Sequence, residues 1–434
     1  MAPKGGSLSK VIVVGAGPSG LLLSILLAKQ GIHVELLEAK EKLDEQPRAT
    51  HYASPAVYEL RRAGVLDDVA AEGFKPKDFC WRKQDGSLIA GMSFAALGPN
   101  HPERMVVLPL GRLGKILYAH LQRYPTATVR WGHRVVDIGQ DANRAWVQVE
   151  TASGPQRSEA DYIVGCDGAN SQIRRSLFGD MVFPGETLDA AIVATNVYYD
   201  FTKYGYWDTN YIVHPKNWHM VARIGNDGLY RVTYAEVPGL TAEEYRQRQP
   251  MRYEEILPGH PKPGDYRILN VSPYKLQQRC APRFRVGRFL LAADAAHLCN
   301  PFGGLGLTGG IADAGSLSDC LIGIHRGLAD DSILDRYADI RRKIYREIID
   351  PTSRENFRRL WAQDPETARE KDEFFQLCHR AERDAALAKE LALGLNVLRH
   401  DFTQYYTNRS SPLNEQKKTL DGLFEPVKTS LLHN

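Results

Sequence analysis

Short apolar runs alternate with polar or glycine-rich stretches over the first forty residues. The β-branched run 11–14 predicts a buried strand, 21–29 predicts a helix that ends at Gly31, and 33–38 predicts a second strand. A strand, a helix and a strand in about thirty residues predict a βαβ unit. Because parallel strands under a covering helix are buried on both faces, the unit predicts a doubly wound α/β sheet.

The middle of the chain has a different pattern. Strand-like runs rich in Tyr, Trp, Val and Thr follow one another at 190–199, 211–214, 219–224 and 229–236. Runs of this kind separated by turns predict an antiparallel sheet. The buried-strand pattern then returns at 289–293, and a glycine-rich turn and a predicted helix at about 306–326 follow it.

These patterns predict an α/β protein whose first domain is interrupted by a second one. We place the two parts of the α/β domain at 1–180 and 275–350, the antiparallel sheet domain at 181–274, and a charged, helical region at 351–434. Asp364 and Pro365 are a good pair of residues to begin a helix in that last region.

Composition excludes several broad classes of protein. The 434 residues are 43% hydrophobic and 25% charged, which is not typical of a disordered, collagen-like or coiled-coil chain. A net charge of +3 is too small to indicate nucleic acid as a partner.

The cysteines indicate a reducing location. They lie far apart and form no CxxC pair, so they indicate neither a disulfide framework nor a zinc site, and we expect no metal. We therefore expect a cytoplasmic protein. The six positions are 80, 166, 280, 299, 320 and 378.

An uncharged stretch at 11–28 could suggest a signal peptide or a membrane span. Its middle, however, contains Gly15, Gly17, Pro18 and Gly20, which would break a spanning helix at its centre. A strand, a turn and a helix explain the same residues better, and we expect no membrane span.

The motif Gly15-x-Gly17-x-x-Gly20 follows the first predicted strand and opens the first helix. Glycines at these positions permit a tight turn, close approach of the backbone to a pyrophosphate, and close packing of helix on strand. Glu38 lies 18 residues after Gly20, at the end of the second strand, where a carboxylate can bind both ribose hydroxyls of an adenosine. The alternative is a structural glycine turn without a ligand. The context favours a dinucleotide site.

Two further motifs carry a resemblance to a known family. They are 287–297 (GRFLLAADAAH) and 167–174 (DGANSQIR). With the glycine motif, in this order and spacing, the chain resembles the single-component FAD-dependent aromatic hydroxylases, the group of p-hydroxybenzoate, salicylate and phenol hydroxylases, over roughly residues 8–345. The resemblance implies a Rossmann-like FAD-binding domain with an inserted β-sheet substrate domain. It also implies FAD as cofactor, NADPH or NADH as reductant, and a small aromatic substrate and molecular oxygen as reactants.

The resemblance also implies roles for individual residues. Arg48 and Arg112 would reach the cofactor, Asp167 would support FAD and influence nicotinamide binding, and Asp294 would bind the ribityl chain. Two sets would line the rest of the cofactor. The ADP half would be held by Gly15, Gly17, Ser19, Gly20, Glu38 and Ala39, and the isoalloxazine ring would lie beside Pro301, Gly304, Gly306 and Leu307.

The chain departs from the family pattern at two positions. Ala293 stands where the family usually has Gly, and Thr308 stands where it usually has Asn. The resemblance implies hydroxylation through a flavin C4a-hydroperoxide, which needs no protein nucleophile, so we predict no catalytic side chain. The helix that begins near Gly306 would point its positive end at the ring and stabilise the anionic reduced flavin.

Residues of the predicted antiparallel sheet are candidates for the substrate pocket. Aromatic walls and a cation suit a phenolic acid, and Arg223 could bind a carboxylate through two hydrogen bonds. The opposing interpretation is that such side chains are simply packed or solvated. The candidates are Tyr211, His219, Arg223 and Tyr234. We interpret His214 and His297 as structural.

Several alternatives stay open on the sequence. Oxygen could enter at a carboxylated carbon with loss of carbon dioxide, or the flavoprotein could be a dehydrogenase or another non-oxygenating protein. A flavin-dependent halogenase is disfavoured because the segment 217–220 does not match the family's WxWxIP stretch. The length favours the compact layout of the salicylate hydroxylases over phenol hydroxylases with a further thioredoxin-like domain. A homodimer is compatible with the sequence, which does not fix the oligomeric state.

Overall fold

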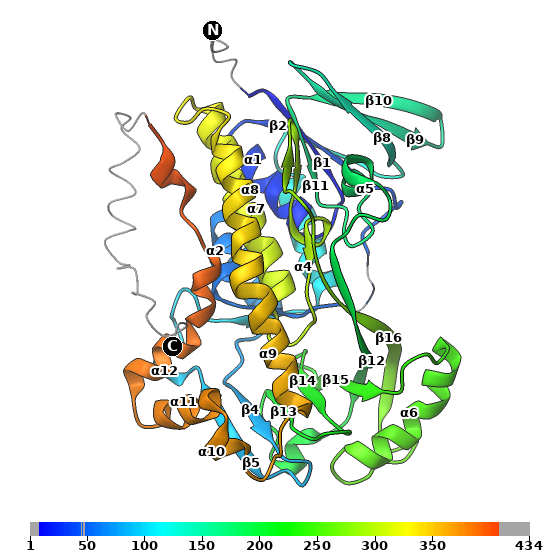
Figure 1. Ribbon diagram of the computed structural model, residues 1–434, viewed down its shortest axis with the longest axis vertical. Coiled ribbons are helices and arrows are strands. Elements are labelled where there is room, and N and C mark those ends of the chain that lie inside the picture. Colours follow the sequence, from blue (N-terminus) through cyan, green and yellow to red (C-terminus); the bar gives the residue numbers. More distant parts are fainter. Residues whose placement is uncertain (1–7, 45, 47, 408–434) are drawn as a thin grey trace.

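The structure is a computed structural model that describes residues 8–44, 46 and 48–407. A mostly parallel sheet forms its first layer, in the upper half of Figure 1. All neighbours in this sheet run parallel except the pair at one edge, β17 and β18. In spatial order the strands are β17 (Arg285–Val286), β18 (Phe289–Leu291), β11 (Tyr162–Gly165), β1 (Lys10–Val14), β2 (His33–Leu37) and β7 (Ala127–Arg130).

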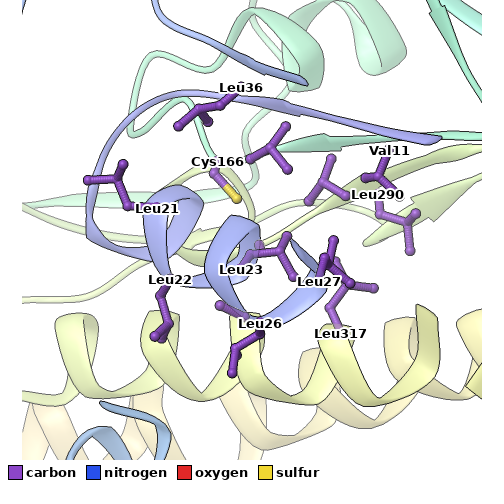
Figure 2. Close-up of a cluster of buried hydrophobic side chains, with 14 of the residues drawn as sticks. Val11, Leu21, Leu22, Leu23, Leu26, Leu27, Leu36, Cys166, Leu290 and Leu317 are labelled. Carbon is purple, nitrogen blue, oxygen red and sulfur yellow. The ribbon is translucent and has the colours of Figure 1, made fainter. Parts of the chain in front are cut away.

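Buried helices cover the parallel sheet. Helix α1 (Pro18–Ala28) lies between the sheet, α7 (Leu305–His325) and α4 (Leu110–Leu121). Figure 2 shows Leu22 and Leu26 pointing from α1 toward α7, while Val11 and Leu290 approach from the strands. Helix α1 is buried on nearly all sides, which explains the uncharged stretch in the sequence. In the described part of the chain, no helix has the length and apolar character needed to cross a membrane.

A second sheet occupies the lower half of Figure 1. Its longest strands, β12 and β16, pair antiparallel and continue toward the parallel sheet, where β16 pairs with β19. In spatial order the strands are β19 (His297–Leu298), β16 (Arg267–Cys280), β12 (Gly185–Tyr198), β15 (Leu229–Glu236), β14 (His219–Arg223), β13 (Thr209–Ile212), β4 (Asp78–Arg82) and β5 (Leu88–Ser93).

The α/β fold predicted from the sequence is confirmed, and each of the four strand-like runs in the middle of the chain is a strand. The predicted domain limits differ from the course of the second sheet. Strands β4 and β5 come from well before the predicted sheet domain, and β19 comes after it. The division at 181–274 stays a prediction.

Helices close the second sheet on both sides. Helix α6 (Ala242–Ile256) packs on one side, and α9 (Asp350–Trp361) and α11 (Glu373–Ala381) pack on the other. Helix α8 (Ile333–Ile344) continues through a π-helical turn (Tyr345–Ile349) into α9, the long run drawn in yellow and orange in Figure 1. The predicted helix start at Asp364 is not a helix start, because the short helix α10 (Ala368–Lys371) begins after it.

The remaining elements connect or extend these layers. They are β3 (His51–Tyr52), α2 (Ser54–Ala63), α3 (Leu66–Glu72), β6 (Val106–Val107), β8 (Arg134–Gln140), β9 (Ala145–Thr151), β10 (Gly154–Ala160), α5 (Gln172–Phe178) and α12 (Ala385–Ala392).

The two sides of the second sheet have different neighbours. Opposite residues of paired strands point to the same side, so Tyr234 and its partner His219 share one side, which Tyr253 of α6 covers. We call this the α6 face. The intervening residues, including Arg231 and Tyr211, point to the opposite side, which packs against Phe302, α9 and α11. We call this the inner face.

Candidate active site

Four predicted cofactor residues lie at one edge of the parallel sheet. Gly15, Glu38, Asp167 and Asp294 each follow a strand shortly after its last residue, and the strands β2, β1, β11 and β18 are consecutive neighbours. In open α/β sheets, ligands bind outside this carboxyl edge. The fold therefore brings together residues that are far apart in the chain.

The three glycines of the turn after β1 have different surroundings. A Cβ on Gly15 would lie 2.4 Å from the Cys166 carbonyl oxygen, and a Cβ on Gly20 would lie 2.0 Å from the Gly15 carbonyl oxygen. Both glycines are therefore required for packing. A Cβ on Gly17 would meet no atom within 4 Å. The open space beside Gly17, at the N-terminus of α1, fits the close approach of a pyrophosphate.

Glu38 is fixed next to this turn. Its carboxylate accepts hydrogen bonds from the backbone N–H of Ala16 at 2.8 Å and of Lys40 at 2.9 Å. A carboxylate accepts about four hydrogen bonds, so it retains capacity for ribose hydroxyls. Ser19 is buried in the first turn of α1, and Ala39 is exposed beside Glu38.

Asp167 binds the start of helix α5. One carboxylate oxygen accepts from the backbone N–H of Gln172 at 2.7 Å and of Ile173 at 3.1 Å. The other oxygen, Oδ1, is buried and has no hydrogen-bond partner among the described residues. Burial raises the pKa of Asp167, and these hydrogen bonds oppose the rise. An unpartnered buried oxygen beside the glycine turn fits a donor from a bound cofactor.

The turn that carries Asp294 has an unusual backbone. Ala293 has φ = +56°, a conformation that favours glycine, and this is the position where the family usually has Gly. Its N–H donates to Asp313 Oδ2 at 2.9 Å. Helix α7 has glycine opposite, because a Cβ on Gly310 would lie 2.6 Å from the Ala293 Cβ. The hydrogen bond and this space accommodate the alanine.

Asp313 is the centre of a buried network under the same turn. It accepts hydrogen bonds from Arg341 Nε at 2.6 Å and from His297 Nε2 at 2.7 Å. Burial alone would raise the pKa of Asp313, but Arg341 and His297 hold it well below its usual range. The ionised carboxylate therefore connects the Asp294 turn, through the Ala293 N–H, with helix α8, through Arg341. This agrees with the structural interpretation of His297.

Asp294 occupies an enclosed position that solvent still reaches. Its side chain is exposed, and yet the surrounding protein raises its pKa by desolvation, while His297 and Arg48 act in the opposite direction. A carboxylate in such a recess can accept hydrogen bonds from a polyol. The placement fits the ribityl chain.

The two predicted arginines have different surroundings. Arg48 pairs with Asp44 at 3.2 Å and acts electrostatically on Asp294, so it lies near the recess. Arg112 is exposed and pairs with Glu72 at 2.7 Å. Arg48 thus acts on the Asp294 turn, whereas the contact recorded for Arg112 is with Glu72 of α3.

The loop after β19 leads into the N-terminus of α7. Gly304 caps the helix with φ = +67°, and neither a capping side chain nor an acidic residue in the first turn neutralises the positive helix end. Pro301 is exposed, and Gly306 and Leu307 are half-buried. An open helix end suits the electron-rich side of a flavin. The Thr308 hydroxyl is buried and has no partner among the described residues.

Tyr211 lies on the inner face of the second sheet. Its ring stacks on Trp81 with centroids 5.4 Å apart and planes at 17°. Burial raises the pKa of Tyr211 to about 12, so its hydroxyl stays protonated at neutral pH. The pair forms an aromatic wall on the side of the sheet that packs against Phe302 of the loop that leads into α7.

Sequence reasoning missed Arg231, also on the inner face. Its Nε donates to Asn196 Oδ1 at 3.0 Å, and an Nη donates to the Arg48 carbonyl oxygen. Within the described ranges, no carboxylate forms an ion pair with it. Burial lowers the pKa of Arg231, and the phenols Tyr274 and Tyr52 lie close enough to oppose the shift. A half-buried cation without a counter-ion suits an anionic ligand.

Arg231 has consequences for its neighbours. Burial and Arg231 lower the pKa of His51 to about 4, so His51 is neutral at pH 7. Burial raises the pKa of Tyr274 to about 12, and Arg231 opposes the rise. The alternation Tyr230, Val232, Tyr234 was the signal that could have found this cluster, because it places the intervening Arg231 on the other side of the sheet.

The other three substrate candidates do not lie with Arg231. His219 is fully buried on the α6 face, where its Nδ1 donates to the Asn217 carbonyl at 2.8 Å and burial lowers its pKa to about 4. Tyr234 packs against Tyr253 on the same side. The guanidinium of Arg223 is held by the Gly225 carbonyl at 3.1 Å and lies over the ring of Phe74. Of the four predicted substrate residues, the fold places only Tyr211 on the inner face.

Comparisons with known proteins agree with this geometry. A family model described as "FAD binding domain" matches residues 9–352. The para-nitrophenol 4-monooxygenase of Pseudomonas sp. (strain WBC-3) is 38% identical over 90% of this chain and 96% of its own length. The 6-hydroxy-3-succinoylpyridine 3-monooxygenase HspB of Pseudomonas putida (strain DSM 28022 / S16) is 38% identical over 82% of this chain and 90% of its own length.

A solved structure confirms the fold. The crystal structure of p-nitrophenol 4-monooxygenase PnpA from Pseudomonas putida DLL-E4 is similar with a TM-score of 0.84 and 36% identity, over 90% of this chain and 98% of that one. The open space at Gly17, the fixed Glu38 and the recess at Asp294 fit FAD in turn. The chain therefore belongs to the FAD binding domain family, and it is an FAD-dependent aromatic monooxygenase.

Proposed function

We propose that the enzyme hydroxylates a phenol whose ionised oxygen is bound by Arg231 on the inner face of the second sheet. The single observation that supports this most is the half-buried guanidinium of Arg231, for which the described residues supply no carboxylate. Asn196 and the Arg48 carbonyl orient that guanidinium. A phenolate would supply the missing negative charge.

In this proposal the cofactor residues act as binding groups. The N-terminus of α1 and Gly17 would hold the pyrophosphate, Glu38 the ribose, and Asp294 the ribityl chain, and the N-terminus of α7 would stabilise negative charge on the ring. FAD held by these residues and reduced by NADH or NADPH would supply the chemistry of oxygen activation and transfer of one oxygen atom to the aromatic ring. The protein itself orients the ring and excludes water.

The inner face favours the reactive form of the substrate. A phenol beside Arg231 loses its proton more readily, because a nearby positive charge lowers an acid's pKa. Burial and Arg231 make protonation of His51 unfavourable, so neutral His51 is a hydrogen-bonding neighbour here rather than the acceptor of that proton. Its Nδ1 lies 2.8 Å from Thr50 Oγ1 and its Nε2 lies 3.4 Å from Thr209 Oγ1, a residue of the inner face. Tyr211 and Trp81 would pack along the ring.

For the substrate we propose a para-substituted phenol. The first compound to test is 4-nitrophenol, because the para-nitrophenol 4-monooxygenase that is 38% identical to this chain is named for it. Oxygen attack at the carbon that carries the nitro group releases nitrite. The balanced reaction consumes 4-nitrophenol, O₂, NAD(P)H and a proton, and yields 1,4-benzoquinone, nitrous acid, NAD(P)⁺ and water. The reductant supplies two electrons, and the second oxygen atom leaves as water.

The test is a measurement of stoichiometry. Purified FAD-loaded protein is mixed with NADH or NADPH and 4-nitrophenol, and NAD(P)H loss, O₂ uptake and nitrite release are recorded. We expect a ratio near one to one to one, and faster NAD(P)H loss with the phenol than without it. NAD(P)H loss that no phenol in a panel accelerates would contradict the proposal. The decarboxylative alternative predicts carbon dioxide from 4-hydroxybenzoate instead.

We also propose a cytoplasmic enzyme, and a homodimer as the assembly to test. All six cysteines lie among the described residues and are free, which agrees with a reducing environment. Light scattering coupled to size-exclusion chromatography would give the mass of the particle in solution. A particle of one chain would contradict the dimer.

A further inference from the structure

A cavity of about 660 Å³ lies outside the candidate active site. It opens between the start of β12 and helix α9. Its lining includes Leu188 and Ala190 of β12, Trp218 of the turn before β14, and Phe357 and Trp361 of α9. Its volume is in the range of small-molecule sites, and aromatic and aliphatic side chains provide most of its walls.

Two aromatic side chains of the cavity wall pack against the loop that leads into α7. Trp218 and Phe357 line the cavity, and both contact Phe302 of the loop that leads into α7. The Phe302 ring stacks on Phe357 with centroids 5.2 Å apart and planes at 12°, and it meets Trp218 edge-on at 5.5 Å. Trp218 and Phe357 meet edge-on at 5.2 Å. We call these three residues the aromatic partition.

We propose that the cavity is the chamber through which the aromatic substrate enters the active site, and that the aromatic partition is its gate. This inference rests on the proposed function. The partition belongs to both sites, because Phe302 packs with Trp81 and Tyr211 in one hydrophobic cluster on the inner face. In this proposal a ring that passes Phe302 would enter the region of the inner face that holds Trp81 and Tyr211.

The cavity suits transient binding of a flat phenol. Its aromatic walls offer stacking to an incoming ring. The two arginines in its lining are already paired, since Arg354 bonds Glu186 at 2.6 Å and Arg358 bonds Glu355 at 2.7 Å. Without a free cation, the chamber holds a phenol less tightly than Arg231 does. A passage requires weaker binding in the cavity than at the site beside Arg231, and this arrangement meets that requirement.

The backbone next to Phe302 consists of glycine, the residue whose backbone is least restricted. Gly303 and Gly304 follow it with φ of +101° and +67°, values that side-chain-bearing residues rarely adopt. The Phe302 N–H donates to Asn300 Oδ1 at 3.1 Å. A change of the Phe302 side-chain rotamer would open the partition while this hydrogen bond stays in place.

The test separates a passage from a binding site by kinetics. Holoenzyme is mixed with 4-nitrophenol in a stopped-flow instrument, and the change in flavin absorbance gives the association and dissociation rates. Ala190→Phe narrows the chamber, and we expect both rates to fall at least tenfold while the Kd changes less than threefold. Phe357→Leu thins the gate, and both rates should rise. Val237→Phe, at an exposed residue after β15, is the control and should leave both rates unchanged.

Three results would overturn the inference. Unchanged rates in both cavity variants would exclude the chamber as the route. If only the association rate or only the dissociation rate changed, so that the Kd changed with it, the cavity would be part of the binding site rather than a passage. A wild-type protein that gives no binding signal with any phenol would contradict the proposed function, and the gate with it. Thermal unfolding of each variant checks that the fold is intact.

Discussion

The two sheets of this enzyme present their polar groups in different ways. The parallel sheet offers them at strand ends, where Gly15, Glu38, Asp167 and Asp294 meet at one edge. The second sheet offers them from one side only, so that Arg231 lies on the inner face while Tyr234 is packed under α6. Strand ends are fixed by local sequence, whereas the side of a sheet is fixed by what packs against it. The first kind of site is therefore readable as a motif and the second is not.

The largest effect should come from the glycine turn of the parallel sheet. Gly20→Ala would place a Cβ 2.0 Å from a backbone oxygen, and we expect folded, FAD-containing protein to be lost. Gly17 has open space and φ = −71°, which alanine tolerates. We therefore expect Gly17→Ala to unfold at the wild-type temperature without FAD and to bind FAD at least roughly tenfold more weakly. Equal FAD affinity would show that the pyrophosphate lies elsewhere.

The next effect compares two arginines of the second sheet. Removing a charged partner from a buried ligand costs about 3 kcal/mol, so Arg231→Met should lower kcat/KM roughly 150-fold. Arg223→Met is the matched variant, since Arg223 already has partners away from the inner face. We expect its kcat/KM to stay within about threefold of wild type. The measurement is steady-state kinetics with 4-nitrophenol. If Arg223→Met lowered kcat/KM more than Arg231→Met, Arg223 rather than Arg231 would be the substrate-binding arginine.

A smaller effect appears in stability against pH. His219 and His51 have folded pKa values near 4 and a reference value of 6.5, so below pH 6.5 the unfolded chain binds protons that the folded chain does not. Stability should therefore fall as pH drops from 7 toward 5, by about 2 kcal/mol for each histidine. His219→Gln removes one of these groups. Denaturant titrations at pH 7 and 5 should show that the free energy of unfolding falls less for this variant than for wild type. An equal fall in both proteins would contradict the lowered pKa of His219.

The smallest effect again contrasts the two faces. The Tyr234 hydroxyl is buried without a partner among the described residues, so Tyr234→Phe should stabilise the fold by about 1 kcal/mol and leave KM unchanged. Tyr211→Phe should leave stability nearly unchanged and alter KM for the phenol. Melting temperatures and KM values measured together test the pair. An altered KM in the Tyr234 variant alone would reverse our assignment of the faces.

The sequence alone predicted the α/β fold and the strands whose ends carry the candidate cofactor residues. Glycine spacing and short β-branched runs are local signals, and the turn after β1 follows from them directly. The sequence could not predict which side of the second sheet faces the substrate. Side chains in 190–236 alternate between the two sides, and this pattern does not show which side α6 covers. Three of the four candidates chosen there lie off the inner face, and Arg231, between Tyr230 and Val232, was passed over. The departure at Ala293 was visible, but its compensation by Gly310 and Asp313 needed the structure.

The most direct test of the account is the protonation state of the bound substrate. 4-Nitrophenol changes its visible spectrum when it loses its proton, so difference spectra of the enzyme–phenol complex report that state at pH 6. If Arg231 binds the phenolic oxygen, the bound compound is the phenolate in wild-type and Arg223→Met protein and the neutral phenol in Arg231→Met protein. A neutral phenol bound to wild-type enzyme at that pH would contradict the central claim.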